Sequence, residues 1–313
     1  MDSGYFKGKV IIITGASSGI GLASARLFSS YGACLVLAAR SIDKLHALAA
    51  ELSSDPSEII CVKTDVSVEE DCRRLIDEAV RHFGRIDILI NNAGLSMRAS
   101  FKEVDLSVIR RLMDVNFWGT VCCTKFALPW LLKSHGSVAG VISVVGYAGL
   151  PGRTGYATSK FAVRGFLETL RMEHQDDGLH VLVFAPGYTA SNVRFAALLA
   201  DGTPQGSTPK DENNLMSADA VALKLAKGLS ERRREMILTT VGRLDVWLYK
   251  RFPRLMDKVQ LYYIRKHEKS VDPERKPGKV DLVDNNCNNA CNSKKPFMIT
   301  KMFLLFLDPD DHV

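Results

Sequence analysis

The sequence lacks an apolar run long enough to cross a membrane. A transmembrane helix needs about 20 mostly apolar residues, and the apolar stretch at residues 297–307 has only about half that length. Residues 1–9 also lack the apolar core of a secretory signal. We therefore expect a cytoplasmic protein whose contact with any cytosol-facing membrane would be peripheral.

The cysteines and one serine argue against two further classes of protein. The seven cysteines form an odd set without framework spacing, which favours reduced thiols. Cys287 and Cys291 have no second cysteine or histidine pair at suitable spacing, so we expect no metal site. Ser143 lacks the G-x-S-x-G surroundings of a hydrolase nucleophile, and no histidine has an evident partner spacing.

Net positive charge is confined to one part of the chain. The formal net charge is +6, and residues 231–279 hold 14 Lys/Arg against 7 Asp/Glu, so the remainder is about neutral. The run Arg232–Arg233–Arg234 has no aromatic platform or reading motif beside it, so we expect no nucleic-acid partner. Residues 243–266 mix aromatic, aliphatic and basic residues around Pro253. This segment either lies on an anionic membrane surface or covers a pocket and packs on a partner subunit.

What the sequence does contain is a regular alternation of short β-branched runs and amphipathic stretches. This pattern predicts an α/β fold, a doubly wound parallel sheet with helices on both faces. Strands are expected at 9–14, 33–39, 59–64, 86–90, 138–145, 180–185 and 236–240. Helices are expected at 19–31, after Ser41, from Ser67 to about 83, and at 107–132, 156–173 and 217–229. From residue 271 the chain turns polar and low in complexity, and we expect 271–313 to be a disordered tail.

A glycine-rich turn lies between the first expected strand and helix. It reads Thr14-Gly15-Ala16-Ser17-Ser18-Gly19-Ile20-Gly21, with the spacing T-G-x-x-x-G-I-G. Glycines allow the backbone to turn sharply and approach a pyrophosphate, and the helix N-terminus offers N–H groups and a partial positive charge. The turn predicts a dinucleotide site.

A tyrosine and a lysine stand four residues apart on an expected helix. Tyr156 and Lys160 therefore project from one helix face. A free phenol, with a pKa of about 10, is a poor base at neutral pH, and we expect the lysine ammonium to lower that pKa. Ser143, at the end of the fifth expected strand, is placed to hydrogen-bond a substrate oxygen and the phenol. Asn116 lies inside a helix, where asparagine is unfavourable, which indicates a special role.

These motifs together resemble the short-chain dehydrogenase/reductase family, and in particular its hydroxysteroid dehydrogenase-like members. The resemblance rests on the glycine-rich turn, Asn91-Asn92-Ala93-Gly94, Asn116, Ser143, Tyr156-x-x-x-Lys160 and Pro186-Gly187, and covers residues 5–245. It implies one domain, which we place at 5–270, in a homodimer or homotetramer. It also implies that Tyr156 is the acid/base of hydride transfer and that Asn116 holds a water linking Lys160 to solvent. The implied cofactor-binding residues are Gly15, Ser17, Ser18, Gly19, Ile20, Gly21, Arg40, Asp65, Val66, Asn92, Ala93, Gly94, Tyr156, Lys160, Pro186, Gly187, Thr189 and Ser191.

The end of the second strand bears on which nicotinamide cofactor is used. An acidic residue there holds the ribose hydroxyls of NAD, whereas a nearby arginine accommodates the 2′-phosphate of NADP. The strand ends in Ala39 and is followed by Arg40, with no acidic residue. A guanidinium–phosphate pair is a strong charge-assisted contact, so we expect NADP(H).

The substrate is the least determined feature. Residues 188–215 form a long irregular stretch with an apolar patch, as substrate loops do. With Ser143 and Tyr156, we expect Leu150, Tyr188 and Phe195 to contact a hydrophobic carbonyl or alcohol, such as a steroid, retinoid, lipid ketone or xenobiotic. The alternative is a non-catalytic NADP-binding regulator or scaffold of the same fold.

Overall fold

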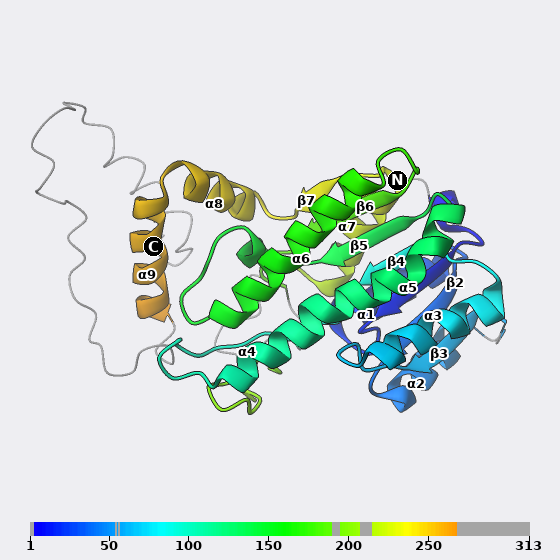
Figure 1. Cartoon of the computed structure of the whole chain (residues 1–313), viewed down its shortest axis with the longest axis horizontal. Coiled ribbons are helices and arrows are strands. Elements are labelled where there is room, and N and C mark those ends of the chain that lie inside the picture. The colour runs from blue at the N-terminus through cyan, green and yellow to red at the C-terminus, as the bar shows by residue number, and fades with distance from the viewer. Residues whose placement is uncertain (1–2, 54, 56, 190–194, 207–214, 268–313) are drawn as a thin grey trace, which may run out of the picture.

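The computed structural model describes residues 3–53, 55, 57–189, 195–206 and 215–267. Seven parallel strands form one sheet in the order β3-β2-β1-β4-β5-β6-β7 (Figure 1). The strands are β1 (Val10–Thr14), β2 (Cys34–Ala39), β3 (Ile59–Lys63), β4 (Ile88–Asn91), β5 (Ser137–Val141), β6 (His180–Ala185) and β7 (Glu235–Ile237). This confirms the predicted doubly wound α/β fold.

Helices cover both faces of the sheet, as the apolar strands require. The helices are α1 (Gly19–Ser30), α2 (Ile42–Leu52), α3 (Glu69–Phe83), α4 (Leu106–Leu112), α5 (Gly119–Lys133), α6 (Thr154–Glu173), α7 (Ala218–Ser230), α8 (Thr240–Arg251) and α9 (Pro253–His267), with 3₁₀ turns η1 (Ser3–Phe6) and η3 (Val144–Gly146). Successive residues of β1 face opposite cores: Ile12 packs with α3, α5 and α6, and Ile13 packs with α1, α2 and α7.

The strand order reverses beside β1. From β1 the sheet runs to β2 and β3 on one side and to β4 through β7 on the other. In open parallel sheets such a reversal opens a crevice at the carboxyl ends of the two central strands. The ends of β1 and β4 are therefore the place to look for a ligand site.

The helix predicted at 107–132 is interrupted. A π-helical segment, η2 (Met113–Trp118), separates α4 from α5 and contains Asn116. The Thr120 hydroxyl donates to the Asn116 carbonyl at 2.8 Å. Gly119 packs closely against Val66, because a Cβ added to Gly119 would lie 2.8 Å from the Cγ2 of Val66. π-segments in helices are frequent at functional sites, so this departure from the prediction fits a special role for Asn116.

Other boundaries also differ from the predicted ones. β5 ends at Val141 rather than at 145, because the Ser143 hydroxyl accepts from the Val145 N–H and caps η3. α3 begins at Glu69 without the expected capping bond from Ser67, whose hydroxyl donates to Asp65 instead. β7 spans Glu235–Ile237 rather than 236–240, since Thr239 caps α8.

The amphipathic segment predicted at 243–266 is a pair of helices. Pro253 is the first residue of α9, a position where its missing N–H costs nothing. The tail predicted at 271–313 lies outside the described residues, as do parts of the predicted substrate loop, 190–194 and 207–214.

His180, at the start of β6, makes folding sensitive to acid. It is buried; its Nδ1 accepts from the Ser137 hydroxyl at 3.0 Å and its Nε2–H donates to the Arg233 carbonyl at 2.8 Å. Burial lowers its pKa from 6.5 to about 4. Between these values the unfolded chain binds a proton that the folded chain does not, so the free energy of unfolding falls as pH falls, by about 3 kcal/mol in all.

Denaturant unfolding at pH 7 and pH 4 checks this expectation. His180→Gln should remove about 3 kcal/mol of the difference between the two pH values. His174→Gln is the control, because His174 lies in a partly exposed pair with Asp177. An unchanged pH dependence in His180→Gln would refute the assignment.

Candidate active site

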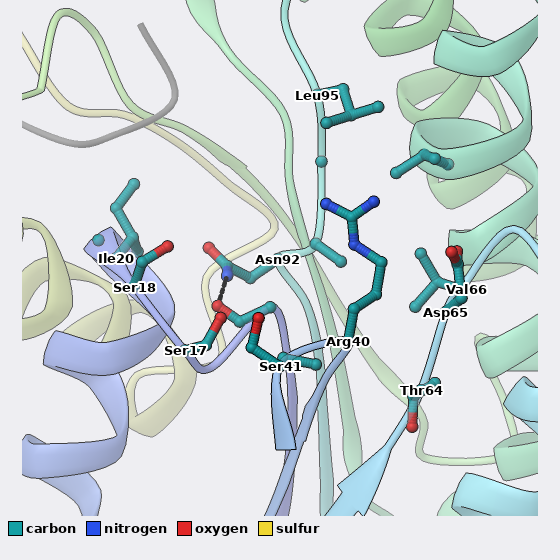
Figure 2. Close-up of a pocket in the computed structure, with 16 residues that line it drawn as sticks. Ser17, Ser18, Ile20, Arg40, Ser41, Thr64, Asp65, Val66, Asn92 and Leu95 are labelled. Atoms are coloured by element: carbon teal, nitrogen blue, oxygen red, sulfur yellow. Dashed lines mark hydrogen bonds between the residues drawn. The ribbon is translucent and has the colours of Figure 1, made fainter. Parts of the chain in front are cut away.

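A cleft lies where the strand order reverses, at the carboxyl ends of β1, β2, β3 and β4 (Figure 2). Of the residues predicted to bind a cofactor, eleven line it: Gly15, Ser17, Ser18, Gly19, Ile20, Arg40, Asp65, Val66, Asn92, Ala93 and Gly94. It also contains Ala39, Ser41, Thr64, Leu95 and Val115, which the sequence analysis did not identify. Each of these five is next in sequence to a residue that was predicted to belong to the site. The sequence could therefore have indicated them as neighbours of predicted residues.

The glycine-rich turn allows two stretches of backbone to approach closely. Gly15 has φ of +68°, a conformation that side chains disfavour. Gly21 does not line the cleft but lies behind it, where a Cβ would stand 2.3 Å from the Gly15 carbonyl oxygen. The turn can pack this closely only because both positions lack side chains.

Hydrogen bonds join this turn to the segment after β4. The Thr14 hydroxyl accepts from the backbone N–H of Asn92 at 3.0 Å and of Ala93 at 3.1 Å. The Asn92 side-chain amide donates to the carbonyls of Thr14, at 2.9 Å, and Gly15. These bonds fix the floor of the cleft, and they give Thr14 a supporting role that its place in the motif did not reveal.

The cleft combines features that suit a dinucleotide phosphate. α1 begins there, and its N-cap, Ser18, makes no side-chain capping bond, so first-turn N–H groups face the cleft uncapped. Figure 2 shows the Arg40 side chain extending between the glycine-rich turn and the Asp65–Val66 segment. Arg40 is exposed, and within the described chain it has no ion-pair or hydrogen-bond partner. The Asp65 carboxylate accepts from the Ser67 N–H at 3.0 Å.

Asn116 is buried and fastens the segment that follows the cleft. Its Oδ1 accepts from the Leu95 N–H at 2.7 Å, and its Nδ2 donates to the Leu95 carbonyl at 3.0 Å and to the Ser159 hydroxyl at 2.8 Å. Ser159 neighbours Lys160 on α6. The side chain of Asn116 therefore ties the cleft to the helix that carries Tyr156 and Lys160; its predicted water relay stays a prediction.

The Lys160 ammonium lies at the junction of the cleft and helix α6. Its Nζ donates to the Val141 carbonyl at the end of β5, at 2.9 Å, and is 5.8 Å from the centre of the Tyr156 ring. A Cβ on Gly94 would be 3.4 Å from this Nζ. Burial lowers the pKa of Lys160 to about 8. The structure thus brings Lys160 to the edge of the cofactor cleft.

Tyr156 and Ser143 meet at the carboxyl edge of the sheet. Burial raises the pKa of the Tyr156 phenol, while a side-chain hydrogen bond with Ser143 and, next, the charge of Arg153 lower it by less. The helical spacing of Tyr156 and Lys160 predicted that Lys160 would lower this pKa. That expectation is wrong for the structure described, because burial of the phenol outweighs the nearby charges and Lys160 is not among them.

The remaining predicted residues lie around this centre without sharing one described cavity. Pro186 follows β6, and its carbonyl accepts from the Val144 N–H beside Ser143 at 3.3 Å. The hydroxyl of Thr189 donates to the Gly187 carbonyl at 3.2 Å. Tyr188 and Phe195 are about half exposed, and Leu150 is half-buried. Ser191 lies outside the described residues.

Two kinds of feature are absent from the described residues. They contain no cluster of His, Cys, Asp and Glu that would hold a metal ion. None of their helices combines the length and the apolar character needed to cross a bilayer.

Comparison with known proteins agrees with the geometry. Residues 9–198 match the model of the family described as short chain dehydrogenase. The chain is 32% identical to dehydrogenase/reductase SDR family member 7B of Rattus norvegicus over 274 residues, which cover 85% of this chain and 84% of that one. It is 40% identical to 11-beta-hydroxysteroid dehydrogenase 1A of Arabidopsis thaliana over 190 residues, which cover 59% of this chain and 54% of that one.

Two solved structures have the same architecture and hold different cofactors. An alcohol dehydrogenase from Thermococcus sibiricus, complexed with 5-hydroxy-NADP, aligns with a TM-score of 0.65 and 26% identity, covering 75% of this chain and 98% of that one. A short chain dehydrogenase/reductase from Burkholderia phymatum, in complex with NAD, aligns with a TM-score of 0.71 and 25% identity, covering 80% and 96%.

Proposed function

Since the chain belongs to the short chain dehydrogenase family of oxidoreductases, we propose that it interconverts a carbonyl and an alcohol by hydride transfer with NADP(H). The observation that carries the proposal is the junction of two sites. The cleft at the glycine-rich turn includes Gly94, which lies beside the Lys160 ammonium, and the Tyr156–Ser143 pair stands on the same helix and sheet edge.

The cofactor assignment rests on the chain's own residues. The α1 N-terminus and the glycine-rich turn would hold the pyrophosphate, and Arg40 would hold a 2′-phosphate. Asp65 and Val66 would face the adenine. When bound, the nicotinamide supplies or accepts the hydride. The alternative, a non-catalytic NADP-binding scaffold, does not account for a phenol, a hydroxyl and an ammonium brought together beside the cleft.

Three side chains take part in the proton transfer that accompanies hydride transfer. Ser143 orients the substrate oxygen and the phenol by hydrogen bonding. In the reductive direction Tyr156, neutral because burial raises its pKa, donates its proton to the substrate oxygen as negative charge develops there. Lys160, protonated at neutral pH with a pKa of about 8, would return a proton to the phenolate through the water predicted at Asn116. In the oxidative direction the same phenolate takes the alcohol proton.

We assign a hydrophobic substrate to the site. The residues predicted to contact the substrate, Leu150, Tyr188 and Phe195, are apolar or aromatic, and the structure leaves each of them at least partly exposed. The direct test is NADPH oxidation with steroid, retinal, quinone and acyl ketone substrates. Turnover of one class supports the proposal; NADPH binding without turnover of any class would favour the scaffold.

Two exposed surfaces support proposals about what the protein binds besides its substrate and cofactor. Trp118, Phe161 and Met172 are exposed on η2 and α6, which supports a homodimer or homotetramer built on these helices. The outer face of α8 carries Leu244 and Trp247 among cations and continues into Phe252, which contacts the Trp247 ring. We assign this α8 outer face to a cytosol-facing anionic membrane.

Charge and position support the membrane assignment. Four exposed cations, Arg243, Lys250, Arg251 and Arg254, surround the aromatic pair, and none is ion-paired within the described chain. Basic and aromatic residues on one helix face are typical of interfacial helices. α8 and α9 project beyond the carboxyl edge of the sheet, the end that holds the site (Figure 1), so lipophilic substrates would enter from the bilayer.

Vesicle sedimentation tests the α8 outer face. We expect binding to phosphatidylcholine–phosphatidylserine vesicles that weakens with salt, and none to phosphatidylcholine alone. Each cation contributes about 1 kcal/mol, so Lys250→Ala should weaken binding about fivefold and Trp247→Ala about tenfold. Lys224→Ala and Leu223→Ala, both exposed on α7, are the controls. Absence of binding at low salt, or equal losses in the controls, would refute the assignment.

A further inference from the structure

Tyr156 stands against a wall built from two distant parts of the chain. The wall consists of residues 95–105, after β4, and residues 197–200, from the predicted substrate loop. Met97 pairs with Leu198 as in a parallel sheet. The Leu198 N–H donates to the Ser96 carbonyl at 2.9 Å, and the Arg98 N–H donates to the Leu198 carbonyl at 2.7 Å. Tyr156 packs on the apolar cluster inside this wall.

The residue that fastens the wall to the helix of Tyr156 is Arg153. It is the N-cap residue of α6, three positions before Tyr156, but its side chain makes no capping bond. Its guanidinium instead donates to the carbonyl of Met97, a residue with no exposed surface. Beside it, the Ala99 N–H donates to the Gly152 carbonyl at 3.1 Å.

The first turn of α6 packs closely against Met97 and helix α4. A Cβ on Gly155 would lie 3.1 Å from the Met97 sulfur and 3.1 Å from carbons of Ile109 and Leu112. The wall and the first turn of α6 keep this packing only while they are held together. Loss of the guanidinium would leave the Met97 carbonyl buried without this donor, which is costly.

Arg153 also acts on the phenol through its charge. Burial raises the pKa of Tyr156; Ser143 lowers it through a hydrogen bond and Arg153 through its charge. Arg153 does not line the cofactor cleft, so its effects on Tyr156 are separable from cofactor binding.

We propose that Arg153 is a positioning residue, which locks the wall formed by residues 95–105 and 197–200 onto the first turn of α6 and thereby sets the place and environment of Tyr156. The role rests on the proposed function only in so far as Tyr156 is the acid/base. The attachment itself is a property of the fold.

Hydrogen exchange tests the attachment without any assay of activity. In Arg153→Met, the amides of Arg98 and Leu198, which form the wall, should exchange about tenfold faster, as expected for a lost bond to a buried carbonyl. Arg111→Met is the matched control, because Arg111 is exposed on α4 and lies outside both wall segments. Exchange equal to wild type in Arg153→Met would overturn the proposal.

A titration tests the effect on the phenol. The tyrosinate absorbance of Tyr156, taken as the difference between each protein and its Tyr156→Phe derivative, should appear at higher pH in Arg153→Met than in wild type. Arg153→Lys keeps the charge and should titrate like wild type. An unchanged titration in Arg153→Met would overturn the electrostatic part of the role.

Kinetics then separate this role from the proposed function. With an active substrate, Arg153→Met should lower kcat about tenfold while the Kd for NADPH stays unchanged. If Tyr156→Phe kept full activity, the proposed function would fail, yet the exchange and titration results would still decide the role of Arg153.

Discussion

Replacement of Tyr156 by phenylalanine is expected to lower kcat about 10³-fold and to leave NADPH binding unchanged. The variant loses one oxygen, the atom that donates the proton in the reductive direction, and general acid catalysis typically contributes 10²- to 10⁴-fold. The ring still packs on the cluster of Met97 and Leu198. Because Tyr156 lies outside the cleft lining, cofactor titration by fluorescence should give the wild-type Kd.

Tyr147 provides the matched control for this prediction. Its phenol is buried, but its hydroxyl donates to Glu235 at 2.5 Å, and Tyr147 does not line the cofactor cleft. Tyr147→Phe removes the same atom and should keep kcat within a few-fold of wild type. Equal activity of the Tyr156 and Tyr147 variants would show that another group supplies the proton.

The strands and most helices were predictable because their signals are local. β2 and β6 are continuous apolar runs, and both are found within a residue of the expected bounds, since strands buried on both faces need apolar side chains at every position. The cleft was also accessible from sequence. Its glycines and polar residues stand at the carboxyl ends of strands, and parallel strands bring those ends together.

The features that sequence reasoning missed depend on contacts between distant residues. The π-segment at Asn116 accompanies the close approach of Gly119 to Val66. Arg153 donates to the carbonyl of Met97, which lies 56 positions earlier in the chain. No periodicity encodes such contacts. The expected effect of Lys160 on Tyr156 failed for a related reason: helical spacing predicts that two side chains are neighbours, but burial, which follows from tertiary packing, dominates the pKa.

Replacement of Arg40 by aspartate is expected to reverse the preference between the two nicotinamide cofactors. Arg40 is the exposed cation of the cleft, and it stands where β2 ends, beside Ser41 and across from Asp65 (Figure 2). A charge-assisted bond to a 2′-phosphate contributes about 1.5–3 kcal/mol, and a carboxylate in its place repels that phosphate. We expect the Kd for NADPH to rise at least about 100-fold. The Kd for NADH should fall or stay constant, because a carboxylate at this position can accept hydrogen bonds from the ribose hydroxyls.

The matched control is Lys44→Asp, which makes the same change of charge on the exposed side of α2. Lys44 does not line the cleft, so its replacement changes the charge of this region without removing a group from the cleft, and the effect of such surface charge is screened by salt. A general electrostatic effect would weaken NADPH binding to both variants equally and would be abolished by salt. A specific phosphate contact weakens it only in Arg40→Asp. The solved structures hold either 5-hydroxy-NADP or NAD in the same fold, so the fold alone does not determine the cofactor. The contrast between these two variants decides whether Arg40 binds the 2′-phosphate. If Arg40→Asp bound NADPH as tightly as wild type, a contact between Arg40 and the 2′-phosphate would be excluded.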